Sequence, residues 1–192
     1  MKRSSFLTTG VSLAAIIALP LRALAHLTGY ARNKTGFFVQ PGKDRNNKAI
    51  NLLEGDTFYT KVSTEDSDGD NYTFESTRLK EGGPSLHYHF EQDEWWYVLK
   101  GTFLFKVGDQ SFEDGEGGSV FGPRMVPHAF SKVGEGEARM LITFQPAGKM
   151  ELFFNKLSQG VARNMTEAEH DKLREEHGFK RVGPPIKYLK KL

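Results

Sequence analysis

The sequence predicts an all-β domain, a sandwich or small barrel, followed by a helical extension. The first observation is a series of short apolar segments between residues 49 and 147, which alternate with glycine- and aspartate-rich turns. The second is composition: 38% of the 192 residues are hydrophobic, enough to bury one sizeable core. The third is the absence of cysteine, which excludes disulfides, thiolate ligands and a cysteine nucleophile.

Residues 1–25 have the pattern of an export signal. Lys2 and Arg3 give a positive start, residues 11–21 form an apolar run, and Ala23-Leu24-Ala25 offers the small side chains of a cleavage site. The apolar run is too short and too often interrupted for a comfortable membrane span, although an uncleaved anchor is the alternative. The stretch Lys-Arg-Ser-Ser-Phe-Leu looks like a degraded twin-arginine motif. We therefore expect an exported protein, periplasmic or extracellular, with the twin-arginine route as one option.

The charge balance excludes a nucleic-acid partner. The formal net charge is +2, but the leader holds three basic and no acidic residues, so 23 basic and 24 acidic residues remain without it. No basic footprint is left. We expect a small-molecule partner and, once the signal is removed, no membrane association. Residues 26–48 show little periodicity and are expected to form an N-terminal arm.

The barrel is expected at residues 49–147, without internal repeats. Its strands are predicted from alternating apolar residues and turn signals. They are expected near 49–53, 56–63, 72–80, 85–89, 94–100, 102–108, 110–112, 119–121, 127–133 and 137–145.

The Lys100-Gly101 pair is typical of a two-residue hairpin turn. Such a turn would pair strands 94–100 and 102–108 directly, and opposed residues share a face. The inward face would then carry one carboxylate, that of Glu94. Its other side chains would all be apolar: Trp96, Val98, Phe103, Phe105 and Val107. The outward face would carry Trp95, Tyr97 and Leu104. A monomer rarely leaves so much apolar surface in water, so the N-terminal arm, the C-terminal helix or a partner chain must cover it. Of these, we expect a homodimer.

Residues 148–192 are expected to form C-terminal helices and a tail. Residues 149–157 are amphipathic, and Thr166-Glu-Ala-Glu169 has the pattern of a capping box that opens a helix ending at Gly178. The tail, which contains Gly-Pro-Pro, is expected to be an extended strap.

The stretch 82–101 carries the pattern of a metal site. His87 and His89 are two residues apart, so on a strand both imidazoles lie on one face. A turn-prone segment follows, and Glu94 can return a carboxylate to the same place. Two neutral imidazoles and a carboxylate suit a divalent transition metal. A lone His-x-His is more often a pair of surface or pocket histidines, so the interpretation needs further support.

A second stretch, residues 118–130, supplies that support, because it places His128 at a strand start after a glycine and proline turn. Together the two stretches resemble the two cupin motifs. The resemblance implies a double-stranded β-helix, or jelly roll. It also implies one divalent metal (Mn, Fe, Ni, Co, Cu or Zn) with the following ligands: His87, His89, Glu94 and His128. Glu91 and Asp93 are rival carboxylates.

The chain departs from the second motif at two positions. Met125 stands where glycine is usual, and Lys132 stands where asparagine often follows the last histidine. Neither is a metal ligand, so the departures concern the substrate pocket. The side chains expected to line that pocket are Trp96, Phe103, Phe105, Met125 and Phe130. Aromatic residues inside a barrel are equally typical of plain core.

Among the cupins, a small exported chain looks most like the quercetinase-like dioxygenases. The resemblance implies a metal that holds a small phenolic or enolic substrate while dioxygen attacks it. It also implies that Glu94 accepts the substrate's proton. Two alternatives stay open: a non-catalytic binding module for a small sugar or organic acid, and a cupin isomerase. Oxygen uptake with a flavonol would separate an oxygenase from a binding module.

Overall fold

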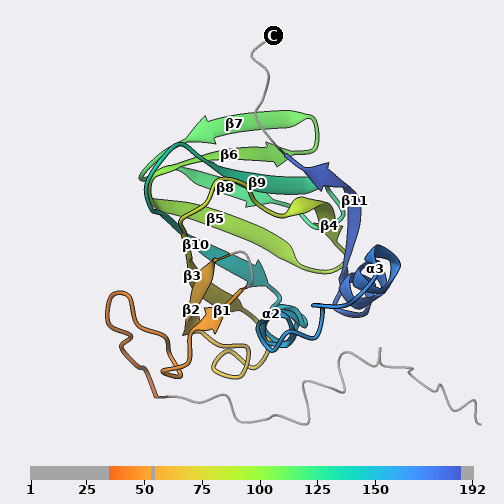
Figure 1. Ribbon diagram of the computed structural model, residues 1–192. Helices are drawn as coiled ribbons and strands as arrows, with labels where there is room; N and C mark the ends of the chain where they lie inside the picture. Colours follow the sequence, from red (N-terminus) through yellow and green to blue (C-terminus); the bar gives the residue numbers. More distant parts are fainter. Residues whose placement is uncertain (1–34, 53–54, 187–192) are drawn as a thin grey trace, which may run out of the picture. The chain divides into compact units, whose positions relative to one another are not determined.

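In a computed structural model of the protein, the described residues, 35–52 and 55–186, form two antiparallel β-sheets and two helices (Figure 1). The predicted export signal and the first part of the predicted arm lie outside these residues, so both stay predictions. No helix within the described part of the chain is long and apolar enough to cross a membrane.

The two sheets are built from strands that are far apart in the sequence. The first sheet has six strands in the following order: β1 (Ile50–Asn51), β2 (Thr57–Val62), β3 (Tyr72–Arg78), β10 (Ala138–Gln145), β5 (Asp93–Lys100) and β8 (Ser119–Gly122). The second has five: β11 (Phe179–Pro185), β4 (Ser85–His89), β9 (His128–Val133), β6 (Thr102–Val107) and β7 (Gln110–Asp114). This arrangement confirms the predicted all-β jelly roll, and the predicted strands lie close to the observed ones.

The predicted hairpin at Lys100-Gly101 is wrong. Strand β5 pairs with β10 and β8, whereas β6 pairs with β7 and β9 in the other sheet. Gly101 therefore turns a corner between the sheets, with a φ of +78°. A side chain there would come within 2.7 Å of the Ala138 Cβ atom. A turn signal marks a sharp change of direction, but it does not specify which strand the chain meets next.

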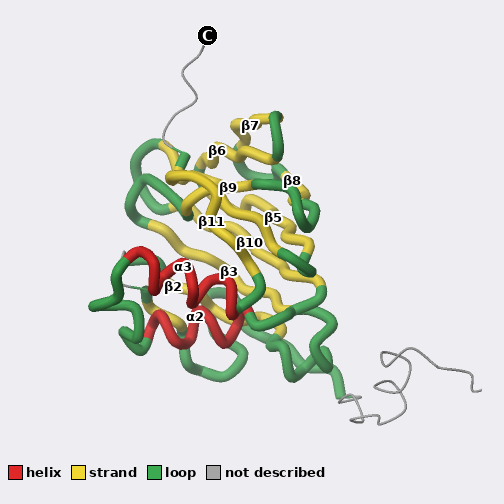
Figure 2. The backbone as a smooth tube through the Cα atoms, turned by 90° about the vertical axis from the view of Figure 1, so that its right-hand side faces the viewer, coloured by secondary structure: helices red, strands yellow, loops and turns green. Residues whose placement is uncertain are grey.

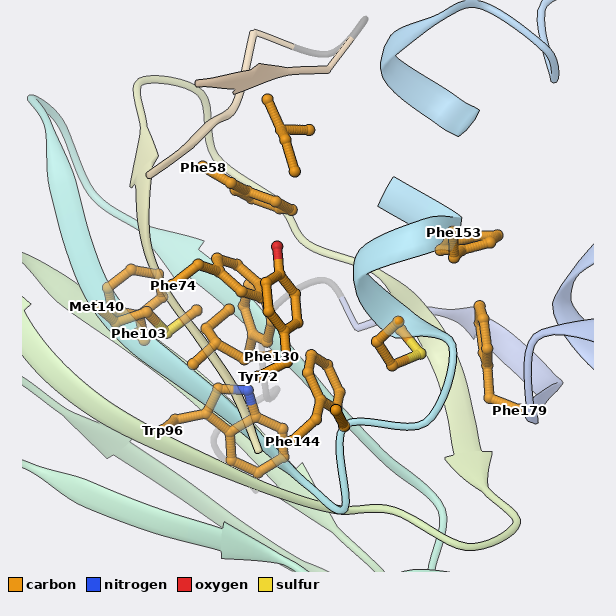
Figure 3. Close-up of a cluster of buried hydrophobic side chains, with 14 of the residues drawn as sticks. Phe58, Tyr72, Phe74, Trp96, Phe103, Phe130, Met140, Phe144, Phe153 and Phe179 are labelled. Carbon is orange, nitrogen blue, oxygen red and sulfur yellow. The ribbon is translucent and has the colours of Figure 1, made fainter. Parts of the chain in front are cut away.

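The inward faces of both sheets form one aromatic core. Trp96, Phe103 and Phe105 are each 0% exposed, as the predicted inward face requires. These three side chains point inward although the predicted hairpin is wrong, because β5 and β6 enclose the same interior from opposite sheets. Phe74 stacks on Phe58 with ring centroids 4.4 Å apart. Figure 3 shows the rings of β2, β3, β5, β6, β9 and β10 gathered into a single cluster.

The C-terminal extension completes the barrel. Helix α2 (Met150–Ser158) buries Met150 and Phe153. Helix α3 (Glu167–Glu176) opens with the predicted capping box. The Thr166 hydroxyl accepts from the backbone N–H of Glu169, and the Glu169 carboxylate accepts from the backbone N–H of Thr166. Figure 2 shows the two helices side by side against the sheets. The tail is more than the predicted strap, because β11 pairs antiparallel with β4 as an edge strand.

The predicted outward face is only partly exposed. Leu104 is 2% exposed in the single chain, so it needs no partner to cover it, contrary to the prediction. Trp95 and Tyr97 are half-buried and stack on each other, with ring centroids 6.0 Å apart. The predicted homodimer therefore stays a prediction that rests on a smaller apolar surface than the sequence suggested.

We expect Gly122→Ala to destabilise the barrel. A Cβ atom at Gly122 would lie 2.7 Å from Cη2 of Trp96 and 3.1 Å from Nδ1 of His128. Overpacking of this kind typically costs about 1–3 kcal/mol. Chemical denaturation measures the loss, and Gly115→Ala is the matched control because its nearest neighbour, the Gly101 oxygen, would be an ordinary 3.6 Å away. Equal stability of the two variants would contradict the prediction.

Candidate metal centre

Three strands from both sheets bring four ligand atoms to one point. His87 and His89 lie on β4 and share a face, as two-residue spacing on a strand requires. His128, the first residue of β9, is the cross-strand partner of His87. Glu94 arrives from β5 in the opposite sheet. The four ligand atoms lie within 4.8 Å of one another, so they can surround one ion.

A single carboxylate oxygen is the centre of this cluster. Oε2 of Glu94 lies 3.2 Å from Nε2 of His89, 3.2 Å from Nε2 of His128 and 3.8 Å from Nε2 of His87. The other oxygen, Oε1, accepts a hydrogen bond of 3.0 Å from Nε1 of Trp96. Trp96 therefore sets the orientation of the carboxylate, and Oε2 remains directed at the three imidazoles.

The hydrogen bonding of the imidazoles fits a metal site. Nδ1 of His87 donates to the backbone oxygen of Ser85 at 2.7 Å, which leaves the lone pair on Nε2 and directs it into the cluster. Nε2 of His128 is buried and has no hydrogen-bond partner, although it lies close to Glu94. A buried nitrogen that faces other ligand atoms without a hydrogen bond is suited to a metal ion.

The electrostatics of the cluster favour an ionised Glu94 and a neutral His89. Burial by itself would raise the pKa of Glu94, but its interactions with His128, His87 and His89 outweigh burial and hold the pKa well below its usual value. Burial lowers the pKa of His89 to about 4, against an opposing influence of Glu94. An anionic carboxylate and a neutral imidazole are the protonation states that bind a divalent cation.

The rival carboxylates lie elsewhere. Asp93 forms an ion pair with Arg124, with 2.6 Å between Oδ2 and Nη2. Glu91 is exposed in the turn between β4 and β5. Among the described residues, the ligand cluster contains neither of them. Glu94 differs from both because alternation on β5 places its side chain inside the barrel.

The metal centre opens into an apolar cavity of about 260 Å³. His87 and Glu94 line it, so the cluster faces the cavity from one wall. Seven phenylalanines from β2, β3, β9, β10, α2 and β11 form most of the remaining wall. Figure 3 shows two of them, Phe153 of α2 and Phe179 of β11, facing each other.

Only one of the five predicted pocket residues lines this cavity. Phe130 does so, whereas Trp96, Phe103 and Phe105 do not and are packed in the core. Met125 is 59% exposed and also does not line the cavity. Its φ of +63° is the left-handed conformation that favours glycine, which gives a backbone reason for glycine at this motif position.

The C-terminal part of the cavity was not predicted from the sequence. Helix α2 contributes four lining side chains and β11 contributes three. The amphipathic pattern of residues 149–157 was a usable signal, because an apolar helix face must pack on something. No local pattern indicated that this face would cover the open side of the barrel.

We expect His87→Ala, His89→Ala and His128→Ala each to lose most of the bound metal. Each variant removes one of the four side chains that would hold the metal. Because a metal that binds only the folded state stabilises it, each variant should also lose thermal stability. Elemental analysis and thermal unfolding of each purified variant measure both effects. His170→Ala is the control, since His170 lies on α3 and its ring bonds to the Ala162 oxygen outside the cluster. Full metal retention in all three variants would refute the assignment.

We expect the metal-free protein to lose stability as the pH falls from about 6.5 to about 4. The pKa of His89 is lowered from 6.5 to about 4 in the folded state, so the unfolded chain binds more protons in this range. The contribution is on the order of 3 kcal/mol. Urea denaturation across this range measures it, and His89→Gln should show a flatter dependence. The corresponding loss for Glu94 lies at lower pH, because its pKa is lowered from 4.5.

A comparison with known protein families agrees with this fold. The family model described as "Cupin domain" matches residues 69–144, which include all four ligands. Comparison with curated protein sequences finds no significant match.

Three solved structures illustrate the likeness. An RmlC-like cupin from Shewanella frigidimarina is 17% identical, with 61% of this chain and 96% of that chain covered and a TM-score of 0.48. The polyketide cyclase RemF from Streptomyces resistomycificus is 22% identical, with 64% and 97% covered and a TM-score of 0.47. A predicted oxalate decarboxylase from Thermotoga maritima is 16% identical, with 52% and 90% covered and a TM-score of 0.46.

These likenesses are too weak to carry information about substrate or reaction. The family match at residues 69–144 includes both motifs, and the jelly roll brings His87, His89, Glu94 and His128 together. Residues 69–144 therefore match the cupin domain family, and the fold around them is a jelly roll.

Proposed function

We propose that this protein is a metal-dependent dioxygenase of the quercetinase-like type, which acts on a small phenolic or enolic substrate. The observation that carries the proposal is the position of the ligand cluster in the wall of an aromatic cavity. His87 and Glu94 belong both to the cluster and to the cavity lining. A substrate in the cavity would therefore lie beside two of the residues that would hold the metal.

The residues divide the work between binding and proton transfer. When bound, the metal supplies a Lewis acid that holds the oxygen atoms of a chelating phenol or enol. The phenylalanine wall binds the flat apolar body and excludes water from it. Glu94 has the position of the general base, since Oε2 lies at the cluster and Trp96 holds Oε1.

The cavity volume favours a small substrate. About 260 Å³ is just below the range of roughly 300–1,000 Å³ that is typical of ligand sites. A molecule of one or two rings suits this volume better than a large polycyclic one.

We expect Glu94→Gln to retain part of the metal and to bind substrate, while kcat for oxygen consumption falls by a factor of about 10²–10⁴. The amide keeps the shape and an oxygen ligand but cannot accept the proton. Oxygen uptake with a panel of small phenols, measured beside metal content, tests this.

Glu91→Gln is the matched control, because Glu91 is three residues away and exposed. Activity of Glu94→Gln equal to that of the parent would remove the proton-transfer role. If the parent binds phenols and gains thermal stability from them but consumes no oxygen, the protein is a binding module instead.

A further inference from the structure

Arginine side chains line the cavity away from the metal centre. Apart from His87 and Glu94, four charged side chains line it: Asp56, Arg78, Arg174 and Arg181. Arg78 and Asp56 form an ion pair with each other, so this pair adds no net charge. The two remaining arginines belong to α3 and β11, and no acidic side chain on those elements lines the cavity.

Arg181 is a direct neighbour of the metal centre. It is the cross-strand partner of His87 in the antiparallel pair of β11 and β4. Opposed residues of such a pair share a face, with Cβ atoms about 4.5–5.5 Å apart. The guanidinium of Arg181 can therefore contact a molecule that also reaches the ligand cluster.

Two acidic side chains of α3 form ion pairs with both arginines. Asp171 accepts from Nε of Arg181 at 2.8 Å and from Nη2 at 2.7 Å, and it also accepts from Nη1 of Arg174. Glu167, the second acidic partner, lies 3.1 Å from Nη1 of Arg174. Its side chain is 64% exposed, so solvent screens its charge. These bonds fix the two guanidinium groups in place and leave Nη1 of Arg181 outside the Asp171 pair.

We infer that the ligand of this cavity is an anion, a small aromatic carboxylate whose carboxylate group is bound by Arg181 and Arg174. Two fixed guanidinium groups match the planar geometry of a carboxylate. The phenylalanine wall binds the ring, and the guanidinium groups of the two arginines donate to the charged end. The inference rests on the cavity that the proposed function uses, and it adds the charge of the ligand.

A pair of probes of equal shape tests the inference without turnover. trans-Cinnamate and its neutral amide, trans-cinnamamide, are titrated calorimetrically into the full-length protein, metal-free and zinc-loaded. We expect the acid to bind about tenfold more tightly than the amide in both forms, because charge-assisted hydrogen bonds exceed neutral ones. Arg181→Met should abolish this preference and Arg174→Met should reduce it, with the affinity for the amide unchanged.

Lys180→Met is the matched control and should keep the preference. Lys180 neighbours Arg181, is exposed, and does not line the cavity. Unchanged affinity for the amide also shows that an arginine variant is folded. If a variant does not fold, the parent protein provides the test. Its preference for the acid over the amide must shrink as ionic strength rises.

Three results would overturn the inference. The first is that the parent protein binds both probes equally or binds neither. The second is that both arginine variants still prefer the acid, and the third is that the parent prefers the acid only in its zinc-loaded form. In the last case the carboxylate binds the metal rather than the arginines. None of these results depends on oxygen consumption, so a failure here is distinct from a failure of the proposed dioxygenase function.

Discussion

The stability of the barrel interior depends on the groups that compensate the charge of one buried carboxylate. Glu94 is 3% exposed, and an uncompensated carboxylate at such a depth would strongly destabilise the fold. The indole of Trp96 satisfies one oxygen and three imidazoles surround the other. The two sheets must therefore be aligned so that β5 faces β4 and β9. The same constraint makes the site rigid, because its ligands come from strands of the barrel rather than from mobile loops.

The C-terminal extension encloses this cluster in a cavity. Without α2, α3 and β11, the metal-facing side of the barrel would lack part of its wall. Phe153 and Phe179 pack edge to face with ring centroids 4.9 Å apart, which joins α2 to β11. Arg181 joins β11 to α3 through Asp171. Residues after the cupin match at 69–144 thus contribute to the shape and charge of the cavity.

The two motifs were enough to predict which four side chains cluster. The two-residue interval of His87 and His89 has one consequence on a strand, whereas the resemblance to the cupin motif favoured Glu94 over Glu91 and Asp93. Alternation also predicted that Trp96 and Phe105 face inward, although the strand pairing behind that prediction was wrong. The period of a strand is a property of its own backbone, so it holds whichever neighbour the strand has.

By itself, the sequence determined the strands, the capped helix that begins after Thr166, and the four side chains that converge on the metal position. Only the tertiary structure decided which strands pair, because turn residues such as Gly101 specify a bend and not a partner. It also decided which aromatic residues line the cavity. Phe103 and Phe130 both face the interior, yet only Phe130 reaches the cavity. Whether an inward side chain becomes core or cavity wall depends on how far apart the sheets lie and on what covers them, and both result from long-range packing.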